Sequence, residues 1–449
     1  MGKLFGTDGI RGVVGENLTV ELAFRTGQAL AHVLKQEKGR APLITIGKDT
    51  RVSSDMLESA LICGICSVGG DVMPFGVLPT PAVAYLTVLK EADAGIVISA
   101  SHNPFEHNGI KVFNEQGYKL PDATEEKIEA VILSDEKIPV ATRGDIGELH
   151  HGLKQAKNDY IHHLAHTIDD DLAGIRILVD CSNGAASATA RELFGRFKCY
   201  VDFICDEPNG ININTNCGST HLDRLSEQVV AGRYDIGVAF DGDADRCLMV
   251  DETGKVIDGD MIMAVCGRQM KREGKLEGNT IVATVMSNLG LHEFCRNNGI
   301  DLVCTAVGDR NVLEKMNECG YRIGGEQSGH MIFTEFATTG DGQLSALQFL
   351  QILARSGKSA SLLVSDFNQY PQILLNAEVS HERGEKERIM GSDELKSAIA
   401  EGEKYLNGEG RILVRASGTE ALIRVMVEAK TEQIAKQVAE NVLKVVKSV

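Results

Sequence analysis

Basic residues are scarce relative to acidic ones in this 449-residue chain: Lys and Arg number 46 and Asp and Glu 63, a formal net charge of −17. Because nucleic acids bind to surfaces with an excess of cations, no nucleic-acid partner is expected. Any anionic ligand must be held by a local cluster of basic side chains. No run approaches the roughly 18 apolar residues of a membrane span, so no membrane partner is expected either.

The features of an exported protein are also missing. The opening MGKLFGTDGIRG has no apolar stretch of the kind found in a secretory leader. The 11 cysteines are an odd number scattered along the chain, which favours reduced thiols over a disulfide framework. The sequence therefore predicts a cytoplasmic protein. With 43% hydrophobic and 24% charged residues, its composition is typical of an ordinary globular protein.

The length corresponds to three or four domains of roughly 150 residues or fewer. Apolar, β-rich runs alternate with amphipathic helical runs: a strand is predicted at 41–49, a helix at 53–68 and a buried strand at 94–101. Similar series begin at residues 176–184 and at 280–288. This alternation predicts an α/β fold with three related domains built on mixed sheets.

The pattern changes after Lys358 to a strand, a helix, two strands and a last helix at 432–447, which predicts a smaller C-terminal α+β domain. The segment 367–371 is the expected linker, because Asn-Gln-Tyr-Pro interrupts a helical pattern. The predicted domains, arranged around a central cleft, comprise residues 1–152, 153–256, 257–367 and 368–449.

Four polar loops follow predicted strands, which is where α/β sheets place their ligand sites. The first is SASHNPFEHNGIK, residues 99–111, in which Ser101 stands at the end of a buried strand. A plain turn before a hairpin is the alternative, since Asn108-Gly109 is a strong turn signal. The GxSxG pattern of serine hydrolases is absent from this loop.

The second loop, DGDADR, places Asp241, Asp243 and Asp245 at alternate positions after a strand. Carboxylates this close repel one another unless a cation neutralises them, and oxygen ligands suit Mg²⁺. An EF-hand does not fit, because its sixth position requires glycine and holds Arg246 here. A solvated acidic turn is the other alternative.

The third loop, GGEQSGH at residues 324–330, offers Glu326, Ser328 and His330 to sugar hydroxyls or to an amine. Its glycines let the backbone approach a ligand closely. By itself this motif is also compatible with a polar glycine turn.

The fourth loop, RASGTEALIR at residues 415–424, has small residues that can form an anion-binding nest. The guanidinium groups of Arg415 and Arg424 and the hydroxyls of Ser417 and Thr419 match a phosphate. It is not a Walker motif. The only GKS, at residues 357–359, has Ile352 where that motif needs glycine, which counts against an ATP-dependent kinase.

Taken in order, FGTDGIRG, SASHNP, DGDADR, GEQSGH and RASGTE resemble the successive signatures of the α-D-phosphohexomutase family across nearly the whole chain. GEQSGH, with Gln327, and the opening segment are similar to its bacterial glucosamine branch rather than to its mannose or glucose branches. Where mannose-type relatives have His in a TGH segment, this chain has Val307-Gly308-Asp309. An Asp there suits an ammonium substrate.

The resemblance implies a role for each motif residue. Ser101 is the phosphorylated nucleophile and, with the three Asp, a ligand of Mg²⁺. The residues expected to stabilise or shuttle charge at the reacting phosphate are Arg11, Lys111, Arg246 and His330. Those expected to bind the substrate are Glu326, Ser328 and Asp309 at the sugar, and Arg415, Ser417, Gly418, Thr419 and Arg424 at the phosphate that is not transferred.

The implied reaction interconverts glucosamine 6-phosphate and glucosamine 1-phosphate through a phosphoserine enzyme. Glucosamine 1,6-bisphosphate, or glucose 1,6-bisphosphate as a primer, is the implied intermediate. The product would feed the synthesis of UDP-N-acetylglucosamine, a peptidoglycan precursor, and the family implies a homodimer. Binding of the sugar phosphate is expected to involve movement of the last domain.

Three alternatives remain open from the sequence. The first is phosphoglucomutase or phosphomannomutase activity. The second is a haloacid-dehalogenase-like sugar phosphatase with Asp241 as nucleophile, although Asp245 stands where that family has Thr or Val. The third is a sugar-phosphate-binding regulator without catalysis, which the joint presence of Ser101, the three Asp and the basic residues argues against.

Overall fold

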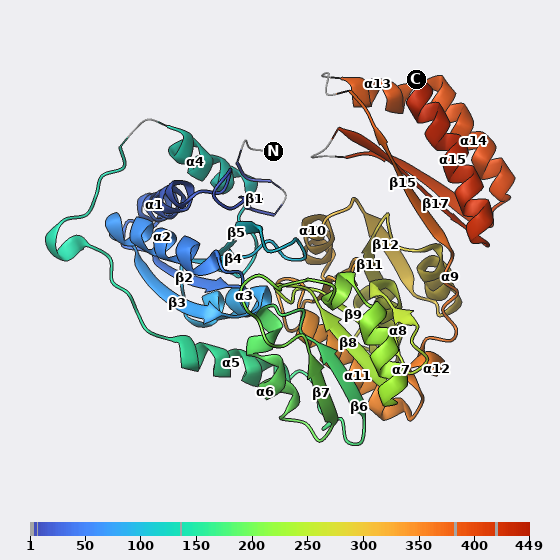
Figure 1. Ribbon diagram of the computed structural model, residues 1–449, viewed down its shortest axis with the longest axis horizontal. Coiled ribbons are helices and arrows are strands. Elements are labelled where there is room, and N and C mark those ends of the chain that lie inside the picture. Colours follow the sequence, from blue (N-terminus) through green and yellow to red (C-terminus); the bar gives the residue numbers. More distant parts are fainter. Residues whose placement is uncertain (1–3, 7, 135–136, 381–383, 418–420) are drawn as a thin grey trace. The chain divides into compact units, whose positions relative to one another are not determined.

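The computed structural model in Figure 1 describes residues 4–6, 8–134, 137–380, 384–417 and 421–449. Contacts within the chain divide it into two units. The first unit comprises Met1–Val285 and Ile300–Ser365, and the second comprises Met286–Gly299 and Asp366–Val449. Within the described ranges, no helix has the length and apolar character needed to cross a membrane.

The first sheet has the strand order β1-β5-β4-β2-β3. Its strands are β1 (Ile10–Val13), β2 (Leu43–Lys48), β3 (Asp71–Val77), β4 (Ala94–Ile98) and β5 (His107–Asn114). β2 runs parallel to β3 and β4, whereas β5 runs antiparallel to β4 and to β1. Every residue of the central strand β4 is buried, which explains its continuous apolar sequence.

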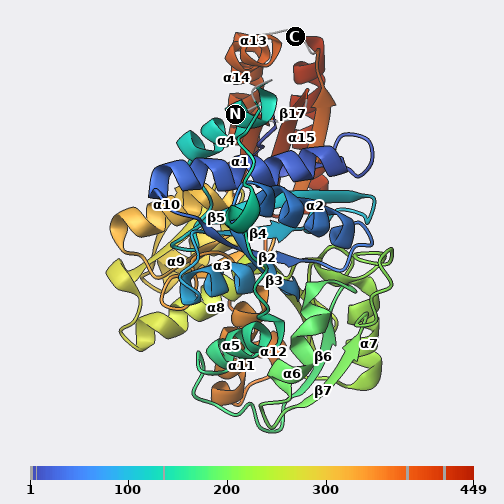
Figure 2. The ribbon, with the colours of Figure 1, turned by 90° about the vertical axis from the view of Figure 1, so that its left-hand side faces the viewer.

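Helices cover both faces of this sheet (Figures 1 and 2). α1 (Val20–Lys38) packs on α2 (Ser54–Ser67) on one side, and α3 (Thr80–Leu89) lies on the other. Glycines allow the close approach of α1 and α2. A Cβ atom at Gly64 would lie 2.1 Å from the carbonyl oxygen of Phe24. The remaining helices of this region are α4 (Asp122–Leu133) and α5 (Leu153–Ala165).

The second sheet has the order β10-β9-β8-β6-β7. Its strands are β6 (Arg176–Asp180), β7 (Tyr200–Ile204), β8 (Ile236–Phe240), β9 (Cys247–Asp251) and β10 (Val256–Ile257). β6 is parallel to β7 and β8, and β9 is antiparallel to β8. The helices α6 (Ala190–Phe194) and α7 (Asp223–Gly232) belong to the same segment of the chain.

The third sheet has the order β12-β11-β13-β14. Its strands are β11 (Thr280–Thr284), β12 (Asp301–Thr305), β13 (Ile323–Gly325) and β14 (Met331–Phe333). β11 is parallel to β12 and β13, and β14 is antiparallel to β13. The helices from this part of the sequence are α8 (Gly259–Arg272), α9 (Leu289–Asn297), α10 (Asp309–Cys319), α11 (Gly342–Ser356) and α12 (Ala360–Leu363).

These three sheets repeat one topology. In each sheet the first strand of the repeat (β2, β6 or β11) lies between the second and third strands and is parallel to both. The fourth strand (β5, β9 or β14) pairs antiparallel with the third (β4, β8 or β13). The prediction of three related mixed α/β domains is confirmed. The repeat also gives the sequence motifs a common position, because 99–106, 241–246 and 326–330 each connect the third strand to the fourth.

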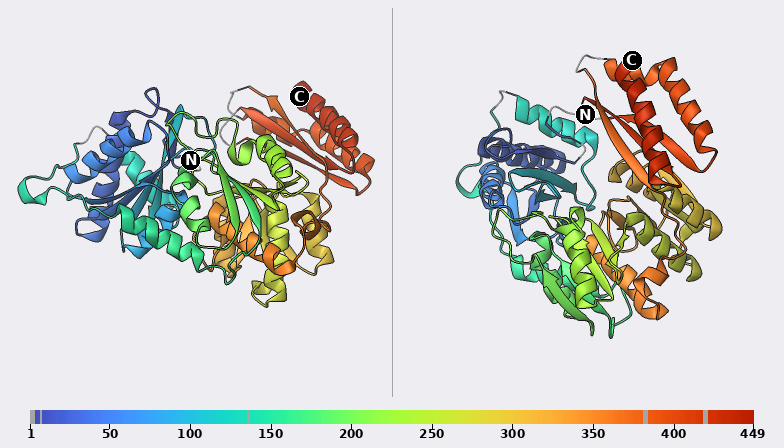
Figure 3. Two further views of the ribbon diagram at one scale, coloured as in Figure 1. Left: turned by 60° about the horizontal axis from the view of Figure 1, so that its bottom comes forward. Right: turned by 45° about the vertical axis from the view of Figure 1, so that its right-hand side comes forward.

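The sheet of the second unit is antiparallel throughout, in the order β15-β17-β16. Its strands are β15 (Gln372–Glu378), β16 (Gly410–Ala416) and β17 (Leu422–Ala429). The helices α14 (Asp393–Leu406) and α15 (Glu432–Ser448) cover one face, as Figure 3 shows, and enclose an apolar core. The smaller C-terminal α+β domain is thereby confirmed; the short helix α13 (Glu385–Gly391) was not predicted.

One buried carboxyl in the first unit makes folding stability depend on pH. Asp341 caps α11 by accepting a hydrogen bond from the backbone N–H of Leu344 (2.9 Å), and it accepts another from the hydroxyl of Tyr160 (2.8 Å). Burial outweighs these hydrogen bonds and raises the pKa of Asp341 to about 6. The folded state therefore holds a proton that the unfolded state releases near pH ~4.

Replacing Asp341 by Asn should remove this pH dependence. The stabilising protonation of Asp341 is present at about pH 4 and is lost as the pH rises through the folded pKa of about 6. The free energy of unfolding of D341N minus that of the wild type should therefore increase by up to about 2–3 kcal/mol between those pH values. Denaturant unfolding across the range, with the exposed Asp393→Asn as control, measures it; a difference that does not change with pH would contradict the assignment.

Candidate active site

Ser101 lies in the loop after β4, with a backbone conformation that side chains rarely adopt. Its φ is 51°, in the left-handed region, and the residue is only 1% exposed to solvent. Its backbone N–H donates to Ser99 Oγ (3.0 Å), and its carbonyl accepts from Arg51 Nη2 and Asn214 Nδ2, both at 2.9 Å. Strained backbone held by surrounding hydrogen bonds is typical of functional sites.

A buried ion pair stands behind this loop. Arg51 Nε lies 2.8 Å from Asp49 Oδ2, and both side chains are fully buried. Asp49 also accepts a hydrogen bond from Ser99 Oγ at 2.6 Å. This pair was not predicted from the sequence. Asp49, Thr50 and Arg51 follow directly after β2, so the preference of α/β sheets for polar groups at strand ends could have identified the pair.

The loop 241–246 brings its three carboxylates to Ser101. Ser101 Oγ donates to Asp241 Oδ2 at 2.5 Å. Asp243 Oδ2 accepts from Thr80 Oγ1 at 2.6 Å and from Lys111 Nζ at 2.8 Å. Carboxylate oxygens of all three Asp lie within 4.8 Å of one another. The serine and the aspartates that the sequence singled out therefore lie together.

This approach depends on a glycine between the aspartates. A Cβ atom at Gly242 would lie 2.4 Å from the carbonyl oxygen of Ser101 and 2.8 Å from Asn214 Nδ2. The backbone of Gly242 is in turn met by Gly184, where a Cβ would lie 2.3 Å from the Gly242 carbonyl oxygen. Both positions are too close for any other residue without movement of the backbone.

The pKa values of the buried charges follow from their crowding. Burial, together with Asp245 and Asp243, raises the pKa of Asp241 well above its ordinary value. Burial opposes the charge on Lys111, but Asp243, Asp8 and Asp245 outweigh it and raise the pKa of that ammonium. The same ammonium, against the effect of burial, lowers the pKa of Asp245.

The acidic cluster has the unsatisfied oxygens that a hard cation requires. Asp243 Oδ1 and Asp245 Oδ1 are buried, and neither has a hydrogen-bond partner within the described part of the chain. Buried carboxylate oxygens without partners are costly, and Mg²⁺ is bound through one or two carboxylates with further oxygen ligands. The donor set therefore fits the magnesium site expected from the sequence.

Further basic groups adjoin the cluster. The backbone N–H of Arg246 donates to Asp241 Oδ1 at 3.2 Å, and its Nε lies 3.9 Å from Asp245 Oδ1. Arg11, on β1, pairs with Asp8. Next to the serine, His102 Nδ1 lies 3.3 Å from Ser101 Oγ. Burial, with the charges of Arg246 and Arg11, lowers the pKa of His102 to about 4 and keeps the ring neutral.

The third loop joins the second through His330. Arg246 and His330 form a backbone bridge, and His330 Nδ1 lies 3.7 Å from Asp245 Oδ2. Its Nε2 accepts from the N–H of Gly340 at 3.1 Å and lies 3.5 Å from Asp309 Oδ2. Burial opposes the imidazolium, but the hydrogen bond and charge of Asp245 outweigh burial and raise the pKa of His330.

Of the two residues expected to bind the sugar hydroxyls, Glu326 accepts a hydrogen bond within the protein and Ser328 does not, among the described residues. Glu326 Oε1 accepts from the backbone N–H of Gly308 at 3.1 Å. Ser328 Oγ is buried and has no hydrogen-bond partner among the residues that the structure describes. Gln327 Nε2 donates to Asp258 Oδ2 at 3.2 Å. Glu326 and Ser328 therefore present polar oxygens in the loop that also carries His330.

Two charged residues that the sequence analysis missed complete the charged network. Lys119 Nζ lies 2.7 Å from both Asp8 Oδ1 and Asp309 Oδ2. Asp8 lies 3.2 Å from Lys111 Nζ as well. Asp8 belongs to the N-terminal glycine-rich motif GTDGIRG, so the motif could have identified it from the sequence. Lys119 follows β5 and belongs to no motif. Asp309 begins α10, where the helix dipole favours a carboxylate.

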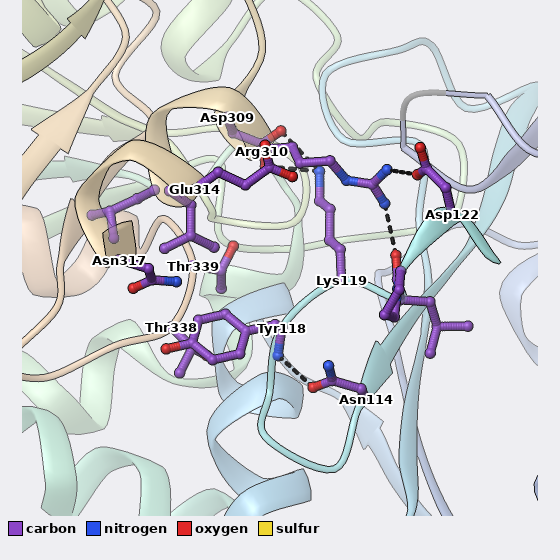
Figure 4. Close-up of a pocket in the computed structure, with 14 residues that line it drawn as sticks. Asn114, Tyr118, Lys119, Asp122, Asp309, Arg310, Glu314, Asn317, Thr338 and Thr339 are labelled. Atoms are coloured by element: carbon purple, nitrogen blue, oxygen red, sulfur yellow. Dashed lines mark hydrogen bonds and ion pairs between the residues drawn. The ribbon is translucent and has the colours of Figure 1, made fainter. Parts of the chain in front are cut away.

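A pocket of about 400 Å³ adjoins this network (Figure 4). Lys119 and Asp309 line it and meet there as an ion pair, and Arg310 donates to the carbonyl of Leu120 at 2.7 Å. Ser101 and the three aspartates are not among its lining residues. The pocket therefore borders the charged network at Lys119 and Asp309.

The predicted phosphate loop lies in the second unit. Arg415 and Arg424 are directly opposite each other on β16 and β17. Like charges opposite each other in an antiparallel pair repel. The backbone N–H of Ser417 donates to the carbonyl of Leu422 at 2.8 Å. The other two residues expected there, Gly418 and Thr419, lie outside the described residues.

Comparison with known families covers nearly the whole chain. Four models described as phosphoglucomutase/phosphomannomutase match it: alpha/beta/alpha domain I at residues 2–138, domain II at 158–254, domain III at 258–370 and the C-terminal domain at 374–445. Phosphoglucosamine mutase of Acetivibrio thermocellus is 50% identical over 447 residues, with 99% of each chain covered.

Solved structures share the fold. A phosphoglucomutase/phosphomannomutase family protein of Burkholderia thailandensis matches with a TM-score of 0.82 at 22% identity, covering 99% of this chain and 97% of that one. N-acetylphosphoglucosamine mutase of Aspergillus fumigatus, in complex with GlcNAc-6P and magnesium, matches with a TM-score of 0.71 at 18% identity, covering 99% and 95%.

Removing the Lys111 ammonium should destabilise the protein, because buried carboxylates would lose their compensating charge. We expect Lys111→Met to lower the free energy of unfolding by about 3–5 kcal/mol, measured by denaturant unfolding without divalent ions. The double variant K111M/D243N should recover part of the loss. The exposed Lys127→Met should cost less than about 1 kcal/mol; an equal loss in K111M and K127M would contradict the electrostatic role of Lys111.

Proposed function

The chain belongs to the phosphoglucomutase/phosphomannomutase family, and on that premise we propose that it interconverts glucosamine 6-phosphate and glucosamine 1-phosphate. The relative from Acetivibrio thermocellus, which is 50% identical and is named phosphoglucosamine mutase, supports the choice of sugar. One observation carries the proposed chemistry. Ser101 Oγ lies 2.5 Å from Asp241 Oδ2, inside a buried cluster of aspartates and lysine.

Ser101 is the group that we assign to carry the phosphate. Phosphoserine adds a charge of about −1.5 to −2 next to three aspartates, so the transfer needs compensating cations. Lys111 supplies one at 2.8 Å from Asp243, and Arg246 supplies another beside Asp245. Arg11 is the third basic group that we assign to the reacting phosphate.

Asp241, Asp243 and Asp245, with an oxygen of phospho-Ser101, would hold Mg²⁺. When bound, the ion supplies positive charge that stabilises the phosphoryl group in transfer. The protein itself fixes the position of the serine. The carbonyl of Ser101 is held by Arg51 and Asn214, so its Oγ stays directed at the acidic loop.

Phospho-Ser101 gives its phosphate to O1 of glucosamine 6-phosphate, forming the 1,6-bisphosphate. The sugar then reorients, and its O6 phosphate returns to Ser101, which releases glucosamine 1-phosphate. We assign the sugar hydroxyls to Glu326 and Ser328, the ammonium to Asp309, and charge stabilisation beside it to His330. Arg415, Ser417, Gly418, Thr419 and Arg424 are proposed to hold the phosphate that is not transferred.

The remaining proposals come from the sequence. We propose that the enzyme is a cytoplasmic homodimer whose product feeds UDP-N-acetylglucosamine synthesis. The predicted domain boundaries at residues 152, 256 and 367 also stay predictions.

A phosphatase with Asp241 as nucleophile is disfavoured by the local contacts. Asp241 Oδ2 accepts a hydrogen bond from Ser101 Oγ, and Oδ1 accepts one from the backbone N–H of Arg246. Ser101 Oγ therefore lies directly at one of these oxygens, and Asp245 stands where that phosphatase family has Thr or Val. Activity on glucose or mannose phosphates is the closer alternative, and it is resolved by comparing the three sugar phosphates on one preparation.

Substituting Ser101 by Ala tests the proposed chemistry. We expect turnover of glucosamine 6-phosphate to fall below detection while binding of glucose 1,6-bisphosphate is retained, because only the phosphate acceptor is removed. A coupled assay for glucosamine 1-phosphate measures turnover, and calorimetry measures binding. Ser67→Ala, on the outer helix α2, is the control and should behave as the wild type; appreciable turnover by S101A would overturn the proposal.

Substituting Asp309 by Asn tests the assignment of the ammonium group. The variant loses the negative charge and leaves the Lys119 ammonium, 2.7 Å from it in the wild type, to repel the substrate amine. We expect kcat/KM for glucosamine 6-phosphate to fall about tenfold more than for glucose 6-phosphate, equivalent to ~1.4 kcal/mol. An equal fall for both sugars would show that Asp309 does not recognise the amine.

A further inference from the structure

A second cluster of reactive side chains lies outside the proposed active site. Sulfur atoms of Cys205 and Cys217 and a carboxylate oxygen of Asp180 all lie within 4.8 Å of one another. Cys205 follows the end of β7 and is partly exposed, whereas Cys217 is 1% exposed. Both are free thiols. The two cysteines are distant in sequence and are brought together by the loop 206–216.

The surroundings of the two sulfur atoms differ. The exposed Arg224 donates from Nη1 to Cys205 Sγ at 3.5 Å, and Asn183 Nδ2 donates to Cys217 Sγ at 3.9 Å. A hydrogen bond from Cys217, with the Arg224 charge, lowers the pKa of the Cys205 thiol. That hydrogen bond and burial raise the pKa of Cys217. Burial and the Asp180 charge oppose this lowering without cancelling it. A partly exposed thiol of lowered pKa beside a buried thiol is the usual arrangement of a redox-sensitive pair.

A structural metal ion is the competing explanation, since two thiolates and a carboxylate suit Zn²⁺. The guanidinium nitrogen 3.5 Å from Cys205 Sγ counts against it, because that positive charge repels a cation and stabilises a thiolate. Both oxygens of Asp180 also accept backbone hydrogen bonds, from Ser182 at 2.8 Å and from Gly218 at 2.9 Å. The observations therefore favour thiol chemistry.

The loop between the cysteines contacts the serine loop. Asn214 Nδ2 donates to the carbonyl of Ser101 at 2.9 Å and to the carbonyl of Asn103 at 3.1 Å. Gly210 accepts from the backbone N–H of Val52 at 2.8 Å. A covalent bond between Cys205 and Cys217 would join the two ends of this loop and constrain the amide of Asn214. Such a bond would thereby act on the residue that holds the Ser101 carbonyl.

We propose that Cys205 and Cys217 form a peroxide-sensitive, reversible disulfide that constrains the loop 206–216 and lowers turnover. The thiolate of Cys205 attacks a peroxide oxygen, the O–O bond breaks, and hydroxide (or alkoxide) leaves; the sulfur becomes a sulfenic acid. Cys217 then attacks that sulfur, the S–OH bond breaks and water leaves. The pair loses two electrons to the peroxide, and a dithiol reductant restores both thiols.

Peptide mapping of the reduced full-length protein after exposure to hydrogen peroxide tests the disulfide. We expect the peptides containing Cys205 and Cys217 to be linked, with loss of two hydrogen atoms, and released by dithiothreitol. In Cys217→Ala, the sulfenic acid on Cys205 should persist and react with a dimedone probe. Arg224→Gln, at an exposed position, should slow the oxidation about three- to tenfold. The exposed Cys63→Ser is the control and should form the link as the wild type does.

The effect on turnover rests on the proposed mutase function, whereas the disulfide does not. Oxidised protein should turn over glucosamine 6-phosphate at least about threefold more slowly, with recovery after dithiothreitol and no loss in Cys205→Ser. No 205–217 link after peroxide, or tight binding of added Zn²⁺ that protects both thiols, would overturn the proposal. A link without a change in turnover of an active enzyme would overturn its coupling to Ser101. Absence of mutase activity in the reduced protein would instead refute the proposed function.

Discussion

The site depends on the balance between buried carboxylates and the Lys111 ammonium. Lys111 lies 2.8 Å from Asp243, 3.2 Å from Asp8 and 3.7 Å from Asp245, with little access to water. Buried charges are tolerated only when they are paired, so the three loops that meet here must be held in register. Asp243 Oδ1 and Asp245 Oδ1, which accept no hydrogen bond from the residues that the structure describes, are available to a further cation. Phosphoryl transfer needs a site that holds both a metal cation and a phosphate next to fixed basic groups, and this cluster has the charged residues for both.

The repeated sheet topology explains how distant motifs reach one place. The segments 99–106, 241–246 and 326–330 each connect a third strand to an antiparallel fourth strand, so each leaves its sheet from the carboxyl end of a central strand. Close backbone contacts then join the loops in pairs. Gly242 meets the carbonyl of Ser101, and Arg246 pairs with His330. One topology used three times thus supplies the nucleophile, the proposed metal ligands and the proposed sugar ligands.

The strands, helices and chemical motifs were predictable because their signals are local: apolar runs mark β4 and β8, and clustered polar residues mark the loops. Ser101, the three Asp, Lys111 and His330 lie together as expected, while their roles stay proposals. Groups that act through long-range contacts were missed: Arg51 and Asn214, which hold the Ser101 carbonyl, and Lys119, which bridges two aspartates. The cysteines show the same limit. Cys63 and Cys66 are only three positions apart in the sequence and lie within α2. The pair that meets, Cys205 and Cys217, has no local signature.

The central claim is that the serine, and not the aspartate bonded to it, carries the phosphate. The most direct measurement locates the phosphate after the protein is incubated with glucose 1,6-bisphosphate, by mass spectrometry before and after treatment with hydroxylamine. A phosphoserine at Ser101 that survives hydroxylamine is the predicted result. An acyl phosphate on Asp241 that hydroxylamine removes would contradict the account.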